Sequence, residues 1–476
     1  MSSVTASSPA VDPTGPVLPV ARSRRRTELI MLAFAFALIV FAMANVGFSL
    51  NGKLPSGVAE YLTAYLIIIL GAHLAMRKFA PWADPLLLPL ATLLNGLGIV
   101  MMYRLSAQVN PATGHPAIGA SQADLQIAFS AIGIGAFVAV LALIREPRVL
   151  QRYTYTLGAV GIFLFALPAL LPASISEVNG ARIQIRFGSF TTIQPEEFAK
   201  LALAAAFAGY LVAKRDVLAL AGRRMLGLDL PRARDLGPIL LTWAASLLLL
   251  VFESDIGTSA VFMGLFVAML YIATSRTSWL LLGFVMFVVG ALAASKLVGH
   301  VGERFDIWLH PFAAANVHRS SYQLVQGLYG MGSGGLLGKG LGAGQPYITP
   351  LVQSDLVFTA FGEEIGLAGV MAILLVYGLI VQRGLRAAMS VKDPFSKLLA
   401  GGLSFMLALQ VFVIVGGVTR LIPLTGITTP FLSQGGSSLV GNWILIALLA
   451  RISDSARRPP PRPIQDEGLT QVVTLK

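Results

Sequence analysis

The sequence predicts an all-α, polytopic membrane protein with about 12 transmembrane helices and a large extracytoplasmic loop. Of its 476 residues, 55% are hydrophobic and 12% are charged, whereas soluble domains carry about 25% charged residues. Apolar segments near the ~20 residues that a bilayer core requires recur along the chain. These segments are 29–50, 58–76, 85–104, 125–144, 154–172, 195–213, 236–252, 256–274, 278–297, 359–382, 398–419 and 436–452.

The basic residues predict the orientation of these segments. Most of the 35 Lys and Arg residues fall in alternate connections between the apolar segments. Such connections face the cytoplasm, so an even number of spans with both termini cytoplasmic is expected. The net charge of +12 is spread over these short connections, which favours a membrane protein over a nucleic-acid-binding one. The absence of cysteine excludes disulfides and thiolate metal sites.

The regions outside the spans differ in character. Residues 1–28 are rich in Pro, Ser and Ala and then basic, and residues 456–476 are rich in Pro and Arg, so both are expected to be disordered cytoplasmic tails. The longest connection is 298–358, which the orientation places outside the cytoplasm. Its aromatic and apolar side chains predict short helices at the membrane interface.

An acidic helix start lies at 194–200, in the sequence QPEEFAK. Pro195 suits the first helical position, and Glu196 and Glu197 favour the dipole of the first turn, so an ordinary helix start is one interpretation. Lys200 follows Glu197 by three residues and enters the apolar segment with it. Charges at that depth are typically paired and face an internal cavity, which favours a Glu197–Lys200 pair in a functional cavity.

A short acidic turn separates two apolar segments at Glu253 and Asp255. The sequence slightly favours a polar hairpin tip here over a functional site. A glycine-rich run follows, with nine glycines between Gly327 and Gly344. It fails the phosphate-loop pattern, because no Ser or Thr follows Lys339. The glycines are expected to permit tight turns or close backbone approach; exposure of backbone N–H groups to an anion is the weaker alternative.

Asp355 is the candidate catalytic group. It stands at the start of an apolar segment, with Glu363 and Glu364 shortly after it. A helix-capping role is one interpretation. The other is a general base, because a carboxylate against apolar surface has a raised pKa that suits proton abstraction.

A polar segment broken by Pro and Gly, residues 425–438, precedes the last span. Irregular backbone at this depth is tolerated where it is buried in protein or lines a water-filled cavity. Ser433, Gln434, Ser437 and Ser438 would supply hydrogen bonds there. A plain interfacial turn is the alternative.

Five stretches in order together resemble the SEDS family (shape, elongation, division and sporulation). The resemblance covers about residues 85–455, the ten-helix family core, so 29–76 are interpreted as two added N-terminal helices. Departures from the family pattern are Glu196 for Ser, Ser254 for Pro, Ser354 for Thr and Gln434 for Tyr. The matching stretches are Gln194–Lys200, Ser254–Thr258, Tyr322–Gly344, Ser354–Gly366 and Thr425–Ser438.

The resemblance implies a peptidoglycan glycosyltransferase in the bacterial cytoplasmic membrane that polymerises lipid II at the outer face, for cell elongation and shape. It implies that Asp355 deprotonates the attacking sugar hydroxyl and that a divalent cation, Mg²⁺ or Mn²⁺, is required. The implied partners are lipid II, the lipid-linked glycan and a class B penicillin-binding protein, with no nucleic acid. Two alternatives stay open: a lipid II flippase, and a non-catalytic scaffold.

The resemblance also assigns supporting roles. Glu363 is the expected supporting carboxylate, Glu197 and Lys200 are expected to hold the cavity wall, and Lys200, Arg182 or Arg186 is expected to help to stabilise charge on the leaving group. The cavity is expected to be completed by Gln194, Glu197, Asp255, Ser433, Ser437 and Ser438.

Overall fold

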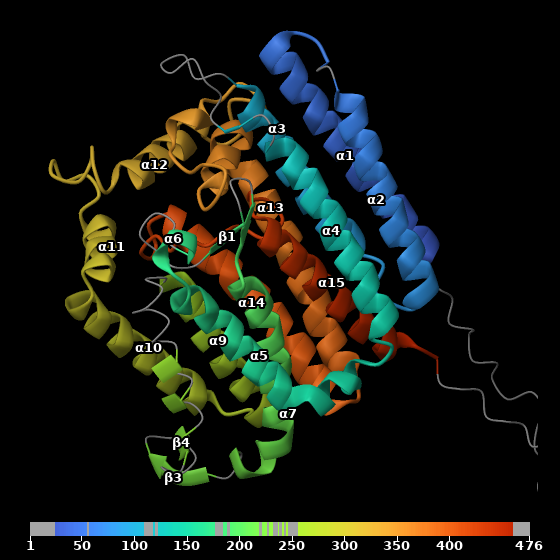
Figure 1. Ribbon diagram of the computed structural model, residues 1–476, viewed down its shortest axis with the longest axis vertical. Coiled ribbons are helices and arrows are strands. Elements are labelled where there is room, and N and C mark those ends of the chain that lie inside the picture. Colours follow the sequence, from blue (N-terminus) through green and yellow to red (C-terminus); the bar gives the residue numbers. More distant parts are fainter. Residues whose placement is uncertain are drawn as a thin grey trace, which may run out of the picture.

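The chain forms a bundle of long helices (Figure 1) in the computed structural model. The structure describes residues 24–459 apart from 55–56, 109–117, 120–121, 177–183, 188–190, 219–220, 226–227, 232–236, 238–239, 242–243 and 246–255. Both expected tails lie largely outside these residues. Within the described part, 10 segments are long and apolar enough to cross a membrane.

These segments coincide with ten of the expected spans. One of them combines the short η1 (Pro147–Tyr153) with α5 (Thr154–Leu170). The others are α1 (Arg25–Asn51), α2 (Val58–Phe79), α3 (Leu87–Ala107), α4 (Gln122–Leu143), α9 (Ile256–Thr274), α10 (Thr277–Leu297), α13 (Val357–Ser390), α14 (Pro394–Val418) and α15 (Gly436–Arg457).

The two remaining expected spans fare differently. A helix forms at the first of them, α7 (Glu196–Leu218), which begins at the acidic pair that the sequence places in a first turn. The second, 236–252, lies mostly outside the described residues. The all-α multi-pass fold class is therefore confirmed.

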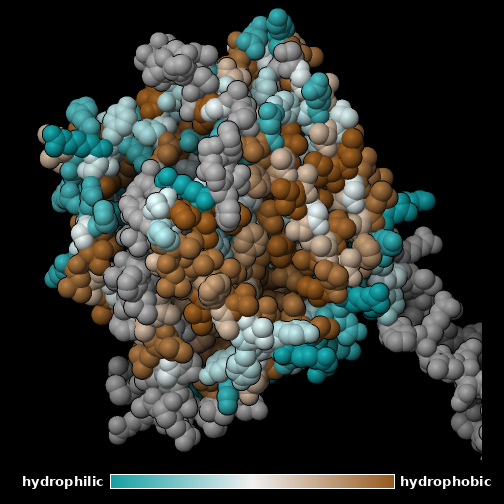
Figure 2. Space-filling view, in the orientation of Figure 1, coloured by the Kyte–Doolittle hydropathy of each residue, from teal (hydrophilic) through white to brown (hydrophobic). Residues whose placement is uncertain are grey.

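The helices pack in sequence-distant pairs. The most extensive packing joins α5 to α7, α4 to α15, α13 to α14 and α1 to α3. Helices α3, α9, α14 and α15 are mostly buried, whereas α1, α2, α5 and α10 keep most of their surface exposed. Hydrophobic side chains cover the middle of the visible face and hydrophilic ones gather toward its edges (Figure 2). This is the distribution of a bundle whose outer helices contact lipid.

The beginning and the end of the bundle lie on the same side. Arg25, at the start of α1, donates to the carbonyl of Ala83, and Arg457, at the end of α15, forms an ion pair with Asp84. Both partners belong to the turn between α2 and α3. We call this side of the bundle the terminal end, and the opposite side, where α3 ends, the site end.

The long connection between α10 and α13 carries the short helices that its composition predicts. These are α11 (Gly299–Leu309), α12 (Tyr322–Gly334) and the single turn η3 (Pro346–Ile348). Two pairs of strands and one short helix were not expected from the sequence. An antiparallel hairpin joins β1 (Ile185–Phe187) to β2 (Thr191–Ile193), and β3 (Ala221–Met225) pairs with β4 (Leu228–Pro231). A four-residue helix, α6 (Ala173–Ser176), precedes the first hairpin.

Candidate active site

Asp355 occupies a turn just before α13, and the residue is 7% exposed. The hydroxyl of Ser354 donates to Oδ1 at 2.9 Å, and Nε2 of Gln323, on α12, donates to Oδ2 at 3.3 Å. Burial raises the pKa of the Asp355 carboxyl above its ordinary value, although these hydrogen bonds and the positive charge of Arg304 oppose that rise. A buried, oriented carboxyl with a raised pKa is suited to general-base catalysis.

The broken segment 425–438 holds this turn in place. The Ser433 hydroxyl donates to the carbonyl of Ser354 and accepts from the backbone N–H of Thr429 at 2.8 Å. The backbone N–H of Gln434 donates to the carbonyl of Gln353 at 2.8 Å. The structure therefore brings Ser433 to the turn that carries Asp355, and two hydrogen bonds join segment 425–438 to that turn.

The start of α7 meets the start of α15 beside this segment. The backbone N–H of Gln194 donates to the hydroxyl of Ser437 at 3.0 Å. Ser438 is buried, and its carbonyl accepts from Nδ2 of Asn442 at 2.7 Å. Glu196 also turns inward, since its carboxylate accepts from the Thr258 hydroxyl at 3.2 Å. Gln194, Ser437 and Ser438 thus lie in one polar layer inside the bundle.

The expected Glu197–Lys200 pair is present. Nζ of Lys200 lies 3.0 Å from Oε1 of Glu197, and each side chain is 4% exposed. The same ammonium donates to Oε1 of Gln410 at 3.3 Å, and Nε2 of Gln410 donates to the carbonyl of Thr428 at 3.2 Å. The pair is therefore linked to segment 425–438, and the charge of Lys200 is already balanced by a buried carboxylate.

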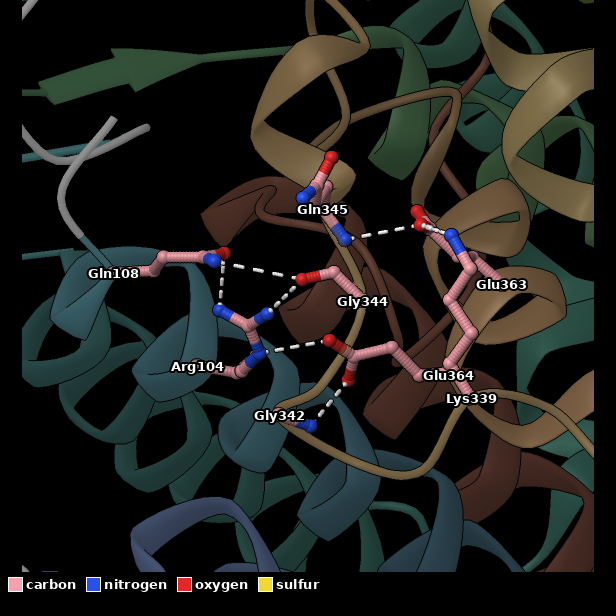
Figure 3. A network of polar contacts seen from close by, with 8 residues as sticks. All are labelled: Arg104, Gln108, Lys339, Gly342, Gly344, Gln345, Glu363 and Glu364. Carbon is pink, nitrogen blue, oxygen red and sulfur yellow. Dashed lines mark hydrogen bonds and ion pairs between the residues drawn. The ribbon is translucent and has the colours of Figure 1, made fainter. Parts of the chain in front are cut away.

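Glu363 and Glu364 bind the glycine-rich run rather than the Asp355 turn (Figure 3). Oε1 of Glu363 accepts from Nζ of Lys339 at 2.7 Å and from the backbone N–H of Gln345 at 3.0 Å. Glu364 accepts from Nε of Arg104 at 2.7 Å and from the backbone N–H of Gly342 at 3.0 Å. The role of Glu363 as a supporting carboxylate stays a prediction, while its observed contacts fasten the loop to α13.

The glycines of this run permit close backbone approach, as the sequence predicts. The N–H of Gly340 donates to the carbonyl of Glu364 at 2.8 Å. At Gly338, with φ +80°, an added Cβ would lie 2.2 Å from that same carbonyl oxygen. Gly366 interrupts α13 with φ 67°, and an added Cβ there would lie 2.3 Å from the N of Gly338. Several N–H groups of the run therefore already serve protein oxygens, which disfavours the alternative of an anion cradle.

The Asp355 turn and the Glu364 carboxylate lie next to different levels of α3. An added Cβ at Gly98 would lie 2.4 Å from the carbonyl oxygen of Phe431, in the segment that holds Asp355. Arg104, the partner of Glu364, is six residues further along α3, which is about 9 Å closer to the site end. The Asp355 layer is thus the deeper one.

Three other residues that the sequence predicts for the site are Arg182, Arg186 and Asp255. Arg182 and Asp255 lie outside the described residues. Arg186 is on β1, exposed, and opposite Thr192 in the hairpin.

Sequence reasoning did not single out Arg304, Gln323 or Gln410. An amide inside an apolar span was the available signal for Gln410, because a buried polar group needs partners. In the part of the chain that the structure describes, no group of three or more His, Asp or Glu residues is arranged for a metal ion.

The fold and this site define a multi-pass helical membrane protein with a buried aspartate whose turn is bound by the connection between its last two helices. Residues 84–458 match the model of the FtsW/RodA/SpoVE family of cell cycle proteins. The match covers most of the chain, so the chain belongs to this family, in agreement with the sequence resemblance.

The relatives extend this result. The chain is 46% identical over 459 residues to the peptidoglycan glycosyltransferase RodA of Mycobacterium tuberculosis strain H37Rv, covering 96% of this chain and 97% of that protein. It is 31% identical over 387 residues to stage V sporulation protein E of Bacillus subtilis strain 168, covering 80% of this chain and 99% of that protein. Of these two relatives, RodA is the more similar to this chain.

Solved structures share the fold. One chain of a peptidoglycan synthase complex, studied for the coordination of polymerization and crosslinking, aligns with a TM-score of 0.59 at 23% identity and covers 79% of this chain and 99% of that chain. The rod shape determining protein RodA of Thermus thermophilus aligns with a TM-score of 0.51 at 23% identity and covers 79% and 98%.

Proposed function

We propose that this protein is a peptidoglycan glycosyltransferase that polymerises lipid II into glycan strands for cell elongation and shape. The observation that carries the proposal is the buried Asp355 carboxyl with its raised pKa, held from both sides by Ser354 and Gln323. The 46% identity to a relative of that name, over almost the full length of both chains, supports it.

In this reaction Asp355 accepts the proton of the 4-hydroxyl of an acceptor GlcNAc. The resulting oxygen attacks the anomeric carbon of the MurNAc at the end of the lipid-linked strand. A new C–O glycosidic bond forms with inversion, the bond from that carbon to the phosphate oxygen breaks, and undecaprenyl diphosphate leaves with the electron pair. Ser354, Gln323 and Ser433 orient the carboxyl for this transfer, which is where positioning contributes most to rate.

The site end then faces outward across the cytoplasmic membrane, and both termini face the cytoplasm. The start of α1 and the end of α15 lie on the same side of the bundle, which supports an even number of membrane crossings. A class B penicillin-binding protein is the proposed partner, supported by the fold shared with a chain of a peptidoglycan synthase complex.

A divalent cation remains part of the proposal. Mg²⁺ in phosphate chemistry is often held by one or two carboxylates together with the substrate's phosphates. In the part of the chain that the structure describes, no acidic cluster is arranged for such an ion, so the diphosphate oxygens would supply most of its ligands. When bound, the metal would supply charge neutralisation on the diphosphate.

The proposal is tested with purified protein in liposomes, supplied with lipid II and Mg²⁺ or Mn²⁺. Glycan polymer resolved on a gel is the expected product. A protein that transfers fluorescent lipid II across the bilayer and makes no polymer would be a flippase, and one that does neither would be a scaffold. Either result would overturn the proposed activity.

A further inference from the structure

Two arginines join α11 to the connection between α14 and α15. Nη1 of Arg304 donates to the carbonyls of Leu424 at 3.3 Å and Thr425 at 2.9 Å. In return, Arg420 donates to the carbonyls of Trp308 at 2.9 Å and Leu309 at 3.1 Å. This reciprocal arrangement, which we call the arginine clip, fixes α11 against the segment that holds the Asp355 turn.

Both clip arginines keep an unneutralised charge. Their printed partners are neutral backbone carbonyls, and among the described residues neither guanidinium is part of an ion pair. By contrast, Lys200, Lys339 and Arg104 each contact a carboxylate within 3.0 Å. A guanidinium carries five N–H donors, so Arg304, which binds these carbonyls through Nη1, keeps Nε and Nη2 for another acceptor.

Arg304 and Asp355 flank the same stretch of backbone. Arg304 binds its beginning at 424–425, while Ser433 binds the Asp355 turn from its far part. Gly426, with φ +78°, would carry a Cβ 3.8 Å from Nη1 of Arg304, so the glycine leaves space next to the guanidinium. The positive charge of Arg304 also acts on the Asp355 carboxyl, where it opposes the rise in pKa that burial causes.

We propose that Arg304 binds the diphosphate of the lipid-linked substrate and of the departing undecaprenyl diphosphate, next to the base Asp355. This proposal rests on the proposed function and specifies the anion subsite of the same site. When the bond from the anomeric carbon to the phosphate oxygen breaks, the electron pair stays on the diphosphate. A guanidinium matches two phosphate oxygens with two parallel N–H donors and stabilises that growing charge.

This assignment differs from the one that the sequence suggests. Lys200 is already paired with Glu197 inside the bundle, and Arg186 lies exposed on the β1–β2 hairpin. A cation that is neutralised by a buried carboxylate attracts an added anion less than an unpaired one. Arg304 combines an unpaired charge with contacts to the backbone segment that also holds the Asp355 turn.

The test compares Arg304→Gln with the matched control Arg420→Gln in the full-length protein in nanodiscs. Each variant removes one positive charge from the arginine clip, and glutamine still donates to a backbone carbonyl. Affinity for undecaprenyl diphosphate is measured directly, so this readout does not depend on turnover, and Tm is measured in parallel. Polymerisation of lipid II gives kcat and KM.

We expect Arg304→Gln to weaken the affinity for undecaprenyl diphosphate about tenfold to a hundredfold, the scale of a hydrogen bond to a charged group. Arg304→Lys should recover part of this loss, because it keeps the charge without the fork. Arg420→Gln should stay within about threefold of the wild type, as is usual for an exposed charge.

The anion subsite is refuted if Arg304→Gln and Arg304→Lys bind undecaprenyl diphosphate as the wild type does. It is equally refuted if both Gln variants lose affinity in proportion to a drop in Tm, since the clip would then be purely structural. Binding that depends on Arg304 in a protein that makes no polymer would sustain the subsite and overturn the glycosyltransferase. If Arg304→Gln polymerises lipid II and binds undecaprenyl diphosphate as the wild type does, the glycosyltransferase activity stands and the anion subsite is overturned.

Discussion

Arg104 and Glu364 form a fully buried ion pair across 260 positions of the chain, with Nε 2.7 Å from the carboxylate oxygen. The guanidinium also donates to the carbonyl of Gly344 at 2.8 Å, and the carboxylate accepts the N–H of Gly342 (Figure 3). The pair thus joins α3, α13 and the glycine-rich run at one point. Removal of one partner from such a pair leaves an uncompensated buried charge.

We expect Arg104→Met to lower the free energy of unfolding by about 3–5 kcal/mol. Arg148→Met is the matched control, because its ion pair with Asp393 is 74% exposed on the arginine side and such pairs contribute about 1 kcal/mol or less. Thermal and denaturant unfolding in detergent measure both. Equal losses in the two variants would show that the buried pair has no special role.

The second prediction concerns Gly338. We expect Gly338→Ala to destabilise the protein by about 1–3 kcal/mol, the range for strain and overpacking, because its φ is positive and a Cβ would meet the carbonyl of Glu364. Gly332→Ala is the control: this helical glycine has open space around its Cβ position, so alanine should be neutral or stabilising by up to about 1 kcal/mol. The free energy of unfolding in detergent is measured for both variants. An unchanged value for Gly338→Ala would contradict the close approach of Gly338 to the carbonyl of Glu364.

The third prediction concerns the positioning of the base. Ser433→Ala removes the hydroxyl that binds both the carbonyl of Ser354 and the N–H of Thr429. We expect kcat for polymerisation to fall about tenfold with little change in KM, because small displacements of a reacting group slow the chemical step. Ser390→Ala, which removes an exposed hydroxyl bonded within α13, is the control. Unchanged kcat in Ser433→Ala would separate this hydroxyl from the site.

The fourth prediction concerns pH and activity. A base must be deprotonated to act, so activity should rise with pH through the raised pKa of Asp355. The acid limb of the pH–rate profile should therefore lie above the ordinary range of an aspartate. A profile that is flat down to that ordinary range would contradict the raised pKa.

The same pKa shift makes a prediction for stability. Because burial raises the folded-state pKa, the stabilisation is fully present below the unfolded pKa and is lost as the pH rises through the folded pKa. Asp355→Asn should therefore raise Tm at neutral pH, and the gain should shrink on acidification. Tm of both proteins measured against pH tests this, and a lower Tm for Asp355→Asn at neutral pH would contradict it.

Local patterns were sufficient for much of this structure. Twenty-residue apolar runs identify the spans because the bilayer imposes their length. The i,i+3 spacing of Glu197 and Lys200 predicts their ion pair because helix geometry alone brings them together. The spacing of glycines indicates close backbone approach, although it does not say which helix is approached.

Contacts between positions far apart in the chain could not be predicted from the sequence. Nothing near Arg104 indicates that Glu364 neutralises it, and nothing near Arg304 indicates that its partners are backbone carbonyls of 424 and 425. The β1–β2 hairpin escaped because three-residue strands carry too little pattern to be detected. Such features arise from tertiary packing, which a single sequence does not display.

The central claim is that Asp355 removes the proton of the attacking sugar hydroxyl. The most direct measurement is polymerisation of lipid II by purified Asp355→Asn, alongside its affinity for undecaprenyl diphosphate. We predict that the rate falls by about 10²–10⁴-fold, the usual contribution of a general base, while expression and affinity are retained. Polymerisation by Asp355→Asn at the wild-type rate would contradict the account.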